Sequence, residues 1–131
     1  MRITFEMLCK MGVCEEHIKF FEAEWPEGVK LTRDFLETDI VLRIGLECFA
    51  QNLCPEIFEP VQIAHEEALT TLQFSYEKTT EPIYQRYLET PGAWVSYQAA
   101  LAPDRGVYEE QLCTIEENYY EALIKIILEQ A

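Results

Sequence analysis

The stretch that decides the fold is residues 76–119, YEKTTEPIYQRYLETPGAWVSYQAALAPDRGVYEEQLCTIEENY. Five tyrosines mark it: Tyr76, Tyr87, Tyr97, Tyr108 and Tyr119. Successive members are eleven, ten, eleven and eleven residues apart. Because eleven residues make three turns of an α-helix, the five rings are expected on one side of a helical path.

The same side of the path continues beyond the tyrosines in both directions. From His65 to Ile126, apolar or aromatic residues recur in steps of three and four, or sums of them. This pattern is typical of amphipathic helix. Prolines divide it, since an interior proline costs about 3 kcal/mol. We therefore predict three helices, of which the first is kinked before Pro82: about Glu59–Glu89, Ala93–Leu101 and Arg105–Glu129.

The first half of the chain is punctuated by helix caps and turns. A threonine precedes two of its apolar stretches and glycine or proline closes others, as helix ends require. The predicted elements are helices over Phe5–Met11 after Thr4, Glu15–Trp25, Thr32 to beyond Leu42 and Leu46–Leu53, with a turn at Pro26–Gly28. The pattern leaves open whether Gly45 breaks a helix.

These elements predict an all-α protein. A chain of 131 residues is expected to form a single domain, 1–131, with a compact helical cluster over 1–55 and long helices over 56–131. Short connections favour antiparallel neighbours, so the long helices are expected to form a bundle or hairpin on which the cluster packs. A single kinked rod is the alternative.

Charge is concentrated in the tyrosine-rich half. The formal net charge is −14; residues 1–55 contain ten acids and six bases, and residues 56–131 fourteen acids and four bases. Such a surface repels nucleic acid and anionic membranes and attracts basic proteins. We therefore expect a basic protein partner and no direct binding of nucleic acid or membrane. Solubility alone is the simpler explanation.

Reactive machinery is not evident in the sequence. There is no phosphate-binding glycine-rich loop, nucleophile elbow or repeated Glu-x-x-His motif, so we predict neither an enzyme nor a cofactor. The five cysteines favour a reducing, cytoplasmic location, and Cys9, Cys48 and Cys113 are expected to be small buried residues. Two alternatives are a zinc site from Cys9, Cys14, Cys54 and His17, and catalysis by Cys14 with His17.

The candidate binding residues are acids and aromatics of the second half. The tyrosine stripe is expected to form a seam between helices, with exposure as a partner surface as the alternative. Trp94 is the best single anchor. Glutamates at helical spacing beside the stripe could imitate a nucleic-acid backbone, since neighbours at i and i+4 lie about 6 Å apart. The predicted partner-binding residues are Glu66, Glu77, Glu81, Trp94, Tyr97, Glu109, Glu110, Glu117 and Glu121.

The chain resembles a set of small phage and prophage proteins. In their front half, a Cys-x5-Phe helix leads to Pro-x-Gly-Val and a threonine helix start. The matching residues here are Cys14, Phe20 or Phe21, Pro26, Gly28, Val29 and Thr32. In their back half, eleven-residue repeats read Pro-x-Ala-Trp-x-x-Tyr-Glu, matched by Pro91 to Tyr97. Gln98 replaces the final glutamate. The resemblance implies a mobile genetic element, hence the cytoplasm of a host cell.

These observations lead to one functional prediction and two alternatives. The prediction is a non-enzymatic, phage-encoded inhibitor that covers the nucleic-acid-binding surface of a host defence complex, of the CRISPR type or another. The first alternative is a self-associating structural module, a homodimer whose interface is the tyrosine seam. The second is a cysteine-based metal or redox protein.

Overall fold

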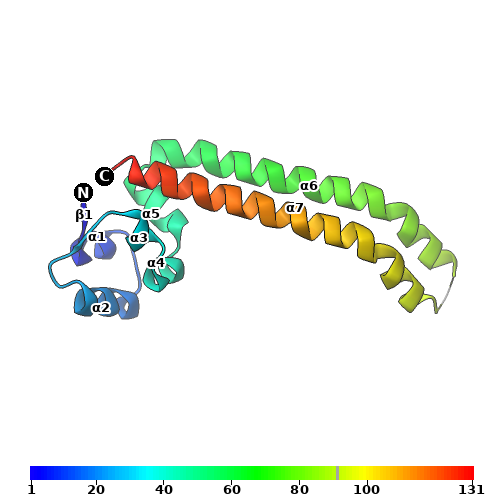
Figure 1. Ribbon diagram of the computed structural model, residues 1–131, viewed down its shortest axis with the longest axis horizontal. Coiled ribbons are helices and arrows are strands. Elements are labelled where there is room, and N and C mark those ends of the chain that lie inside the picture. Colours follow the sequence, from blue (N-terminus) through cyan, green and yellow to red (C-terminus); the bar gives the residue numbers. More distant parts are fainter. Residues whose placement is uncertain (91) are drawn as a thin grey trace. The chain divides into compact units, whose positions relative to one another are not determined.

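The computed structural model describes residues 1–90 and 92–131, and in them the all-α prediction is confirmed (Figure 1). The described chain divides into two compact units. The first unit contains Met1–Gln62 and Tyr119–Ala131, and the second contains Ile63–Asn118. Two long helices, α6 (Pro55–Glu89) and α7 (Trp94–Leu128), contribute to both units.

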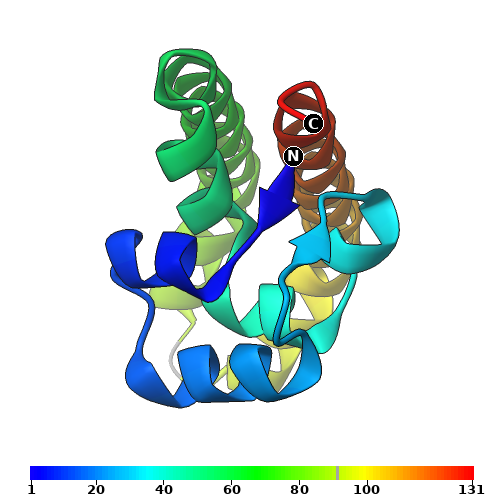
Figure 2. The ribbon, with the colours of Figure 1, turned by 90° about the vertical axis from the view of Figure 1, so that its left-hand side faces the viewer.

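The first unit contains five short helices and one strand pair (Figure 2). Strand β1 (Arg2–Ile3) pairs antiparallel with β2 (Val29–Lys30). Gly28 precedes β2 with a φ of +81°, and a Cβ there would lie 2.7 Å from the carbonyl oxygen of Ile3. Only glycine satisfies both conditions. The predicted turn before β2 is therefore confirmed, and it positions the strand pair.

Helix caps place the short helices largely where the sequence predicts them. Thr4 caps α1 (Phe5–Lys10) and Thr32 caps α3 (Arg33–Leu36), each through its side-chain oxygen. The prediction of one helix from Thr32 to beyond Leu42 is wrong, because a turn at Glu37 and Thr38 divides this segment into two helices. The remaining short helices are α2 (Glu15–Glu24), α4 (Asp39–Ile44) and α5 (Leu46–Leu53). Gly45, with a φ of +99°, separates the last two.

The core of the first unit joins the helical cluster to the ends of the long helices. Phe35 is central, since its ring lies edge-on to those of Phe21 and Phe49. Ile124 and Ile127, from the last turns of α7, are fully buried in the same core. Burial of an aliphatic side chain of this size contributes about 1.5–3 kcal/mol. The predicted packing of the cluster on the long helices is confirmed at these residues.

The second unit is an antiparallel helix pair, Ile63–Glu89 of α6 and Trp94–Asn118 of α7 (Figure 1). The prediction of three helices is wrong, because α7 continues through Pro103 without interruption. The start of α6 is also earlier than predicted, at Pro55, where proline suits the first helical turn. Pro82 and Pro103 are exposed, on sides of their helices where a carbonyl that has lost its partner can be hydrated. Pro91 lies outside the described residues.

Candidate functional site

We call the five regularly spaced tyrosines between residues 76 and 119 the tyrosine ladder, and four of them form the seam of the helix pair. The ring centroids of Tyr76 and Tyr108 are 4.6 Å apart, and those of Tyr87 and Tyr97 are 4.7 Å apart and stacked. All four side chains are half-buried. Pairs of this geometry contribute about 0.5–1.5 kcal/mol beyond their buried area. The preferred prediction, a seam, is confirmed for these four rings.

The fifth tyrosine of the ladder belongs to the first unit. Tyr119 is buried, and its hydroxyl donates a hydrogen bond of 2.8 Å to Glu47 of α5. A buried tyrosine needs such a partner for its hydroxyl. This contact connects the end of α7 to α5 inside the first unit.

The predicted glutamates divide into two sets. Six of them lie in the second unit, are exposed, and form no ion pair among the described residues: Glu66, Glu77, Glu81, Glu109, Glu110 and Glu117. The seventh, Glu121, lies in the first unit and is bound by Arg33 of α3. The first set therefore presents free negative charge to solvent, whereas the charge of Glu121 is balanced within the chain.

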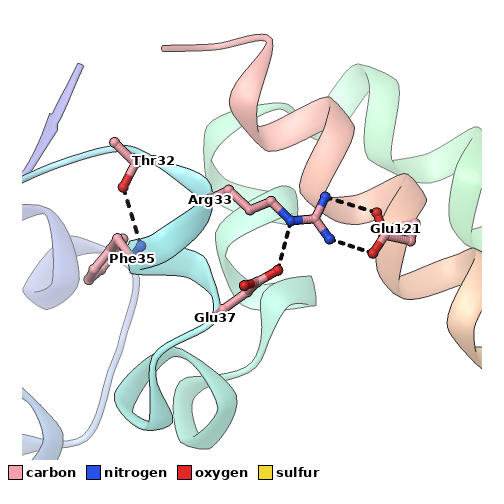
Figure 3. A network of polar contacts seen from close by, with 5 residues as sticks. All are labelled: Thr32, Arg33, Phe35, Glu37 and Glu121. Atoms are coloured by element: carbon pink, nitrogen blue, oxygen red, sulfur yellow. Dashed lines mark hydrogen bonds and ion pairs between the residues drawn. The ribbon is translucent and has the colours of Figure 1, made fainter.

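Arg33 holds Glu121 and Glu37 together (Figure 3). The guanidinium donates to both oxygens of Glu121, and its Nε donates to Glu37 at 2.7 Å. The hydrogen bonds from Arg33 lower the pKa of Glu121. The pKa of Arg33 is raised, mainly by its hydrogen bonds to Glu121 and, to a smaller extent, by its hydrogen bond to Glu37. The fork-like, two-bond geometry fixes orientation as well as charge. We interpret this network as a link within the first unit.

Trp94 lies at the first residue of α7 and is more than half exposed. One of its ring contacts is with Tyr97, at a centroid distance of 5.8 Å, and another is with Tyr87. Val95, the next residue along α7, is exposed as well. The predicted anchor is therefore supported from one side by the tyrosine seam and open to solvent on the other.

A groove of about 670 Å³ brings three predicted residues of the second unit together. Glu77 and Glu81 of α6 and Tyr97 of α7 contribute to its lining. The other lining residues are Phe74, Lys78, Thr80 and Tyr84. We call this the acidic-aromatic groove. It is the place where predicted charge and predicted aromatic surface coincide.

Two residues of the acidic-aromatic groove were missed by the sequence analysis. Phe74, 67% exposed, and Tyr84, 45% exposed, are large rings left open to solvent. Both lie off the regular ladder, which is why a search for eleven-residue spacing passes over them. The signal that could have found them is the step of three, four and three residues from Phe74 through Glu77 and Glu81 to Tyr84, which defines one helix face.

A second groove of about 700 Å³ has a mainly apolar and uncharged lining. It is lined by Glu110 and by uncharged residues of both helices: Ala68, Thr71, Leu72, Ser75, Val107, Gln111, Thr114 and Ile115. Glu110 is the one predicted residue that it contains. Four of the predicted glutamates, Glu66, Glu109, Glu117 and Glu121, line neither groove.

The cysteines are distributed differently from the prediction. Cys9 and Cys113 are exposed, so their predicted burial is wrong, and Cys48 is half-buried. Leu8 faces the core, so the side chain of the next residue along the helix, Cys9, points toward solvent. Cys113 donates a 3.4 Å hydrogen bond to Glu117, which raises the pKa of this thiol. Desolvation raises the pKa values of Cys48 and Cys54.

Within residues 1–90 and 92–131, no group of three or more His, Cys, Asp or Glu side chains is placed to hold a metal ion. Cys14 is exposed at the start of α2, whereas Cys54 is buried. Among the helices described, none is both long and apolar enough to cross a bilayer.

No protein-family model, curated protein or solved structure matches the chain.

Proposed function

We propose that the protein is a binding module that occupies a basic, nucleic-acid-binding surface on another protein and so competes with nucleic acid there. The observation that supports this function most directly is the charge of the second unit. Residues 63–118 contain ten acids and three bases. Nine of the ten acids are exposed and, among the described residues, none of the ten forms an ion pair.

The use of the tyrosine rings favours a hetero-partner over the homodimer alternative. Four rings of the ladder are paired within the helix pair, so that seam is already occupied. Two copies of the acidic unit would also repel each other over most of their surface. A basic surface meets neither obstacle.

The magnitude of the charge limits how the competition works. The helix pair is about 40 Å long at 1.5 Å per residue, so its net charge of −7 amounts to roughly one charge per 6 Å. Duplex DNA carries one charge per about 1.7 Å. Charge alone therefore does not reproduce a duplex. Contacts from exposed rings such as Phe74, Tyr84 and Trp94 must add to the charge.

A narrower role follows from the resemblance to phage proteins. If the chain acts in an infected cell, the basic surface belongs to a nucleic-acid-binding complex of host defence, and the protein is its inhibitor. This narrower role depends on the resemblance, whereas the broader proposal depends on the charge and shape of the second unit.

Affinity capture from a host lysate tests the proposal. The full chain is immobilised, and retained proteins are eluted with double-stranded DNA or RNA at constant ionic strength. We expect a basic protein that nucleic acid displaces and whose retention falls steeply with added salt. A retained protein indifferent to both would contradict competition at a nucleic-acid surface.

Two matched variants separate local charge from total charge. The first carries Glu66→Gln, Glu77→Gln and Glu81→Gln in the second unit. The second removes the same charge from exposed positions of the first unit, through Glu6→Gln, Glu22→Gln and Glu24→Gln. We expect the first variant to lose retention and the second to keep it. Equal retention by both would show that the second unit has no special part in binding.

A further inference from the structure

We infer that the acidic-aromatic groove binds arginine side chains of the basic partner. This inference rests on the proposed function and deepens it, since it assigns the contact to one groove and to one type of side chain. The groove belongs wholly to the second unit and is lined by both of its helices. Its volume, about 670 Å³, accommodates a long side chain together with part of its backbone.

The order of side chains along α6 carries the inference. Phe74, Glu77, Glu81 and Tyr84 follow one another at intervals of three, four and three residues, so they share one face over about 15 Å. Two carboxylates therefore lie between two exposed rings. A guanidinium uses both features, because it stacks flat on an aromatic face and donates in parallel to a carboxylate.

Existing contacts leave these groups available. Glu77 accepts a hydrogen bond of 3.1 Å from Gln73, one turn earlier, which orients its carboxylate while leaving acceptor capacity. Neither Glu77 nor Glu81 is ion-paired within the described residues. Tyr97 is half-buried and in contact with Tyr84 at a centroid distance of 6.2 Å, so it supports the exposed ring.

Arginine fits this groove better than lysine. The lysine ammonium is a compact, strongly hydrated charge that gains less from a flat ring, whereas the guanidinium is planar and weakly hydrated. Lys78 lines the same groove and opposes any incoming cation. Lys78 therefore allows a test in the opposite direction. Neutralising Lys78 should strengthen the binding of arginine, whereas neutralising Glu77 and Glu81 should weaken it.

Fluorescence anisotropy with defined peptides tests the inference on the full chain. The probes are labelled peptides that alternate glycine with arginine, with lysine, or with the neutral analogue citrulline. We expect affinity to fall in that order. Phe74→Leu and Tyr84→Leu should each reduce arginine-peptide affinity about two- to fivefold, the size of an exposed cation–π contact. Phe74→Tyr should retain it.

A matched pair of charge variants shows whether the groove or the general field binds the peptide. Glu77→Gln with Glu81→Gln removes two charges inside the groove, and Glu67→Gln with Glu89→Gln removes two outside it on the same helix. We expect the first pair to cost at least fivefold more affinity than the second, and Lys78→Gln to increase affinity. Equal losses, no preference for arginine, or no binding of any peptide would overturn the inference. Displacement of a lysate partner by nucleic acid would then still stand as a separate result.

Discussion

Tyr87 and Tyr97 stack across the helix pair with ring centroids 4.7 Å apart. Eleven residues before Tyr87 and eleven after Tyr97, Tyr76 and Tyr108 form the next pair. In an antiparallel pair, equal steps in opposite directions keep partners level with each other, so one spacing on both helices produces successive ring pairs. The two ring pairs, Tyr87 with Tyr97 and Tyr76 with Tyr108, therefore fix which residues of α6 lie opposite which residues of α7.

Loss of the stacked pair should reveal a coupling between its members. In a double-mutant cycle with Tyr87→Leu and Tyr97→Leu, we expect a coupling free energy of about 0.5–1.5 kcal/mol in urea unfolding. Additive effects within about 0.3 kcal/mol would show that the stack contributes area alone. Tyr87→Phe keeps the ring and should leave the coupling intact.

Two glycines should respond to alanine with opposite signs. Gly28→Ala places a Cβ 2.7 Å from a backbone oxygen at a positive φ, so we expect unfolding free energy to fall by about 1–3 kcal/mol. Gly106 lies within α7 and a Cβ there meets nothing within 4 Å. Gly106→Ala should therefore stabilise the protein by about 0.5–1 kcal/mol. Denaturant unfolding measures both, and stabilisation by Gly28→Ala would refute the turn geometry.

The proline inside α7 should be dispensable for the helix. Pro103→Ala restores the missing N–H, at an exposed position where no packing is lost, so thermal stability should rise, by up to about 3 kcal/mol. Circular dichroism during heating provides the measurement. A decrease in stability would mean that the helix pair needs the proline at this point.

The Arg33 network should make stability depend on acidity. Because Arg33 lowers the pKa of Glu121 in the folded protein, the stabilisation is present above the ordinary glutamate pKa. It is lost as pH falls through the lowered value. The raised pKa of Arg33 keeps it charged throughout this range. Arg33→Gln should reduce stability at neutral pH and flatten the acid side of the profile.

An exposed ion pair provides the control for Arg33. Lys19 and Glu15 are one helical turn apart and largely exposed, so Lys19→Gln should leave the pH profile almost unchanged. If the stability–pH profiles of Arg33→Gln and Lys19→Gln overlap, the Arg33 network has no particular role in the first unit.

The thiol of Cys113 should become more reactive when Glu117 is neutralised. The carboxylate raises the pKa of Cys113, so Glu117→Gln should lower it and increase the thiolate fraction. Labelling with a maleimide at mildly alkaline pH, resolved by cysteine in a mass spectrometer, should show faster modification at Cys113. Labelling of the exposed Cys9 should not change and provides an internal reference.

Helix type and caps were predictable because their causes are local. Thr4 and Thr32 cap helices through their own side chains, and the eleven-residue spacing predicts the ring seam. Proline positions misled the prediction, because a local cost of about 3 kcal/mol is offset by the packing of a long helix pair. The packing of α6 against α7 cannot be read from any short stretch of the sequence. Cysteine exposure was misjudged for a similar reason, since an apolar neighbourhood in sequence does not say which side chain faces inward.

The amino-acid sequence by itself determined the helical class, the seam and the surplus of acid, since periodicity and charge are properties of order along the chain. Tertiary structure alone decided which acids are free. Arg33 and Glu121 are 88 residues apart, and only folding brings guanidinium and carboxylate into contact. The acidic-aromatic groove likewise exists only because antiparallel pairing places Tyr97 of α7 beside the Phe74–Tyr84 face of α6. Local rules act over a few residues, whereas contact between distant segments depends on the energy of the whole packed state.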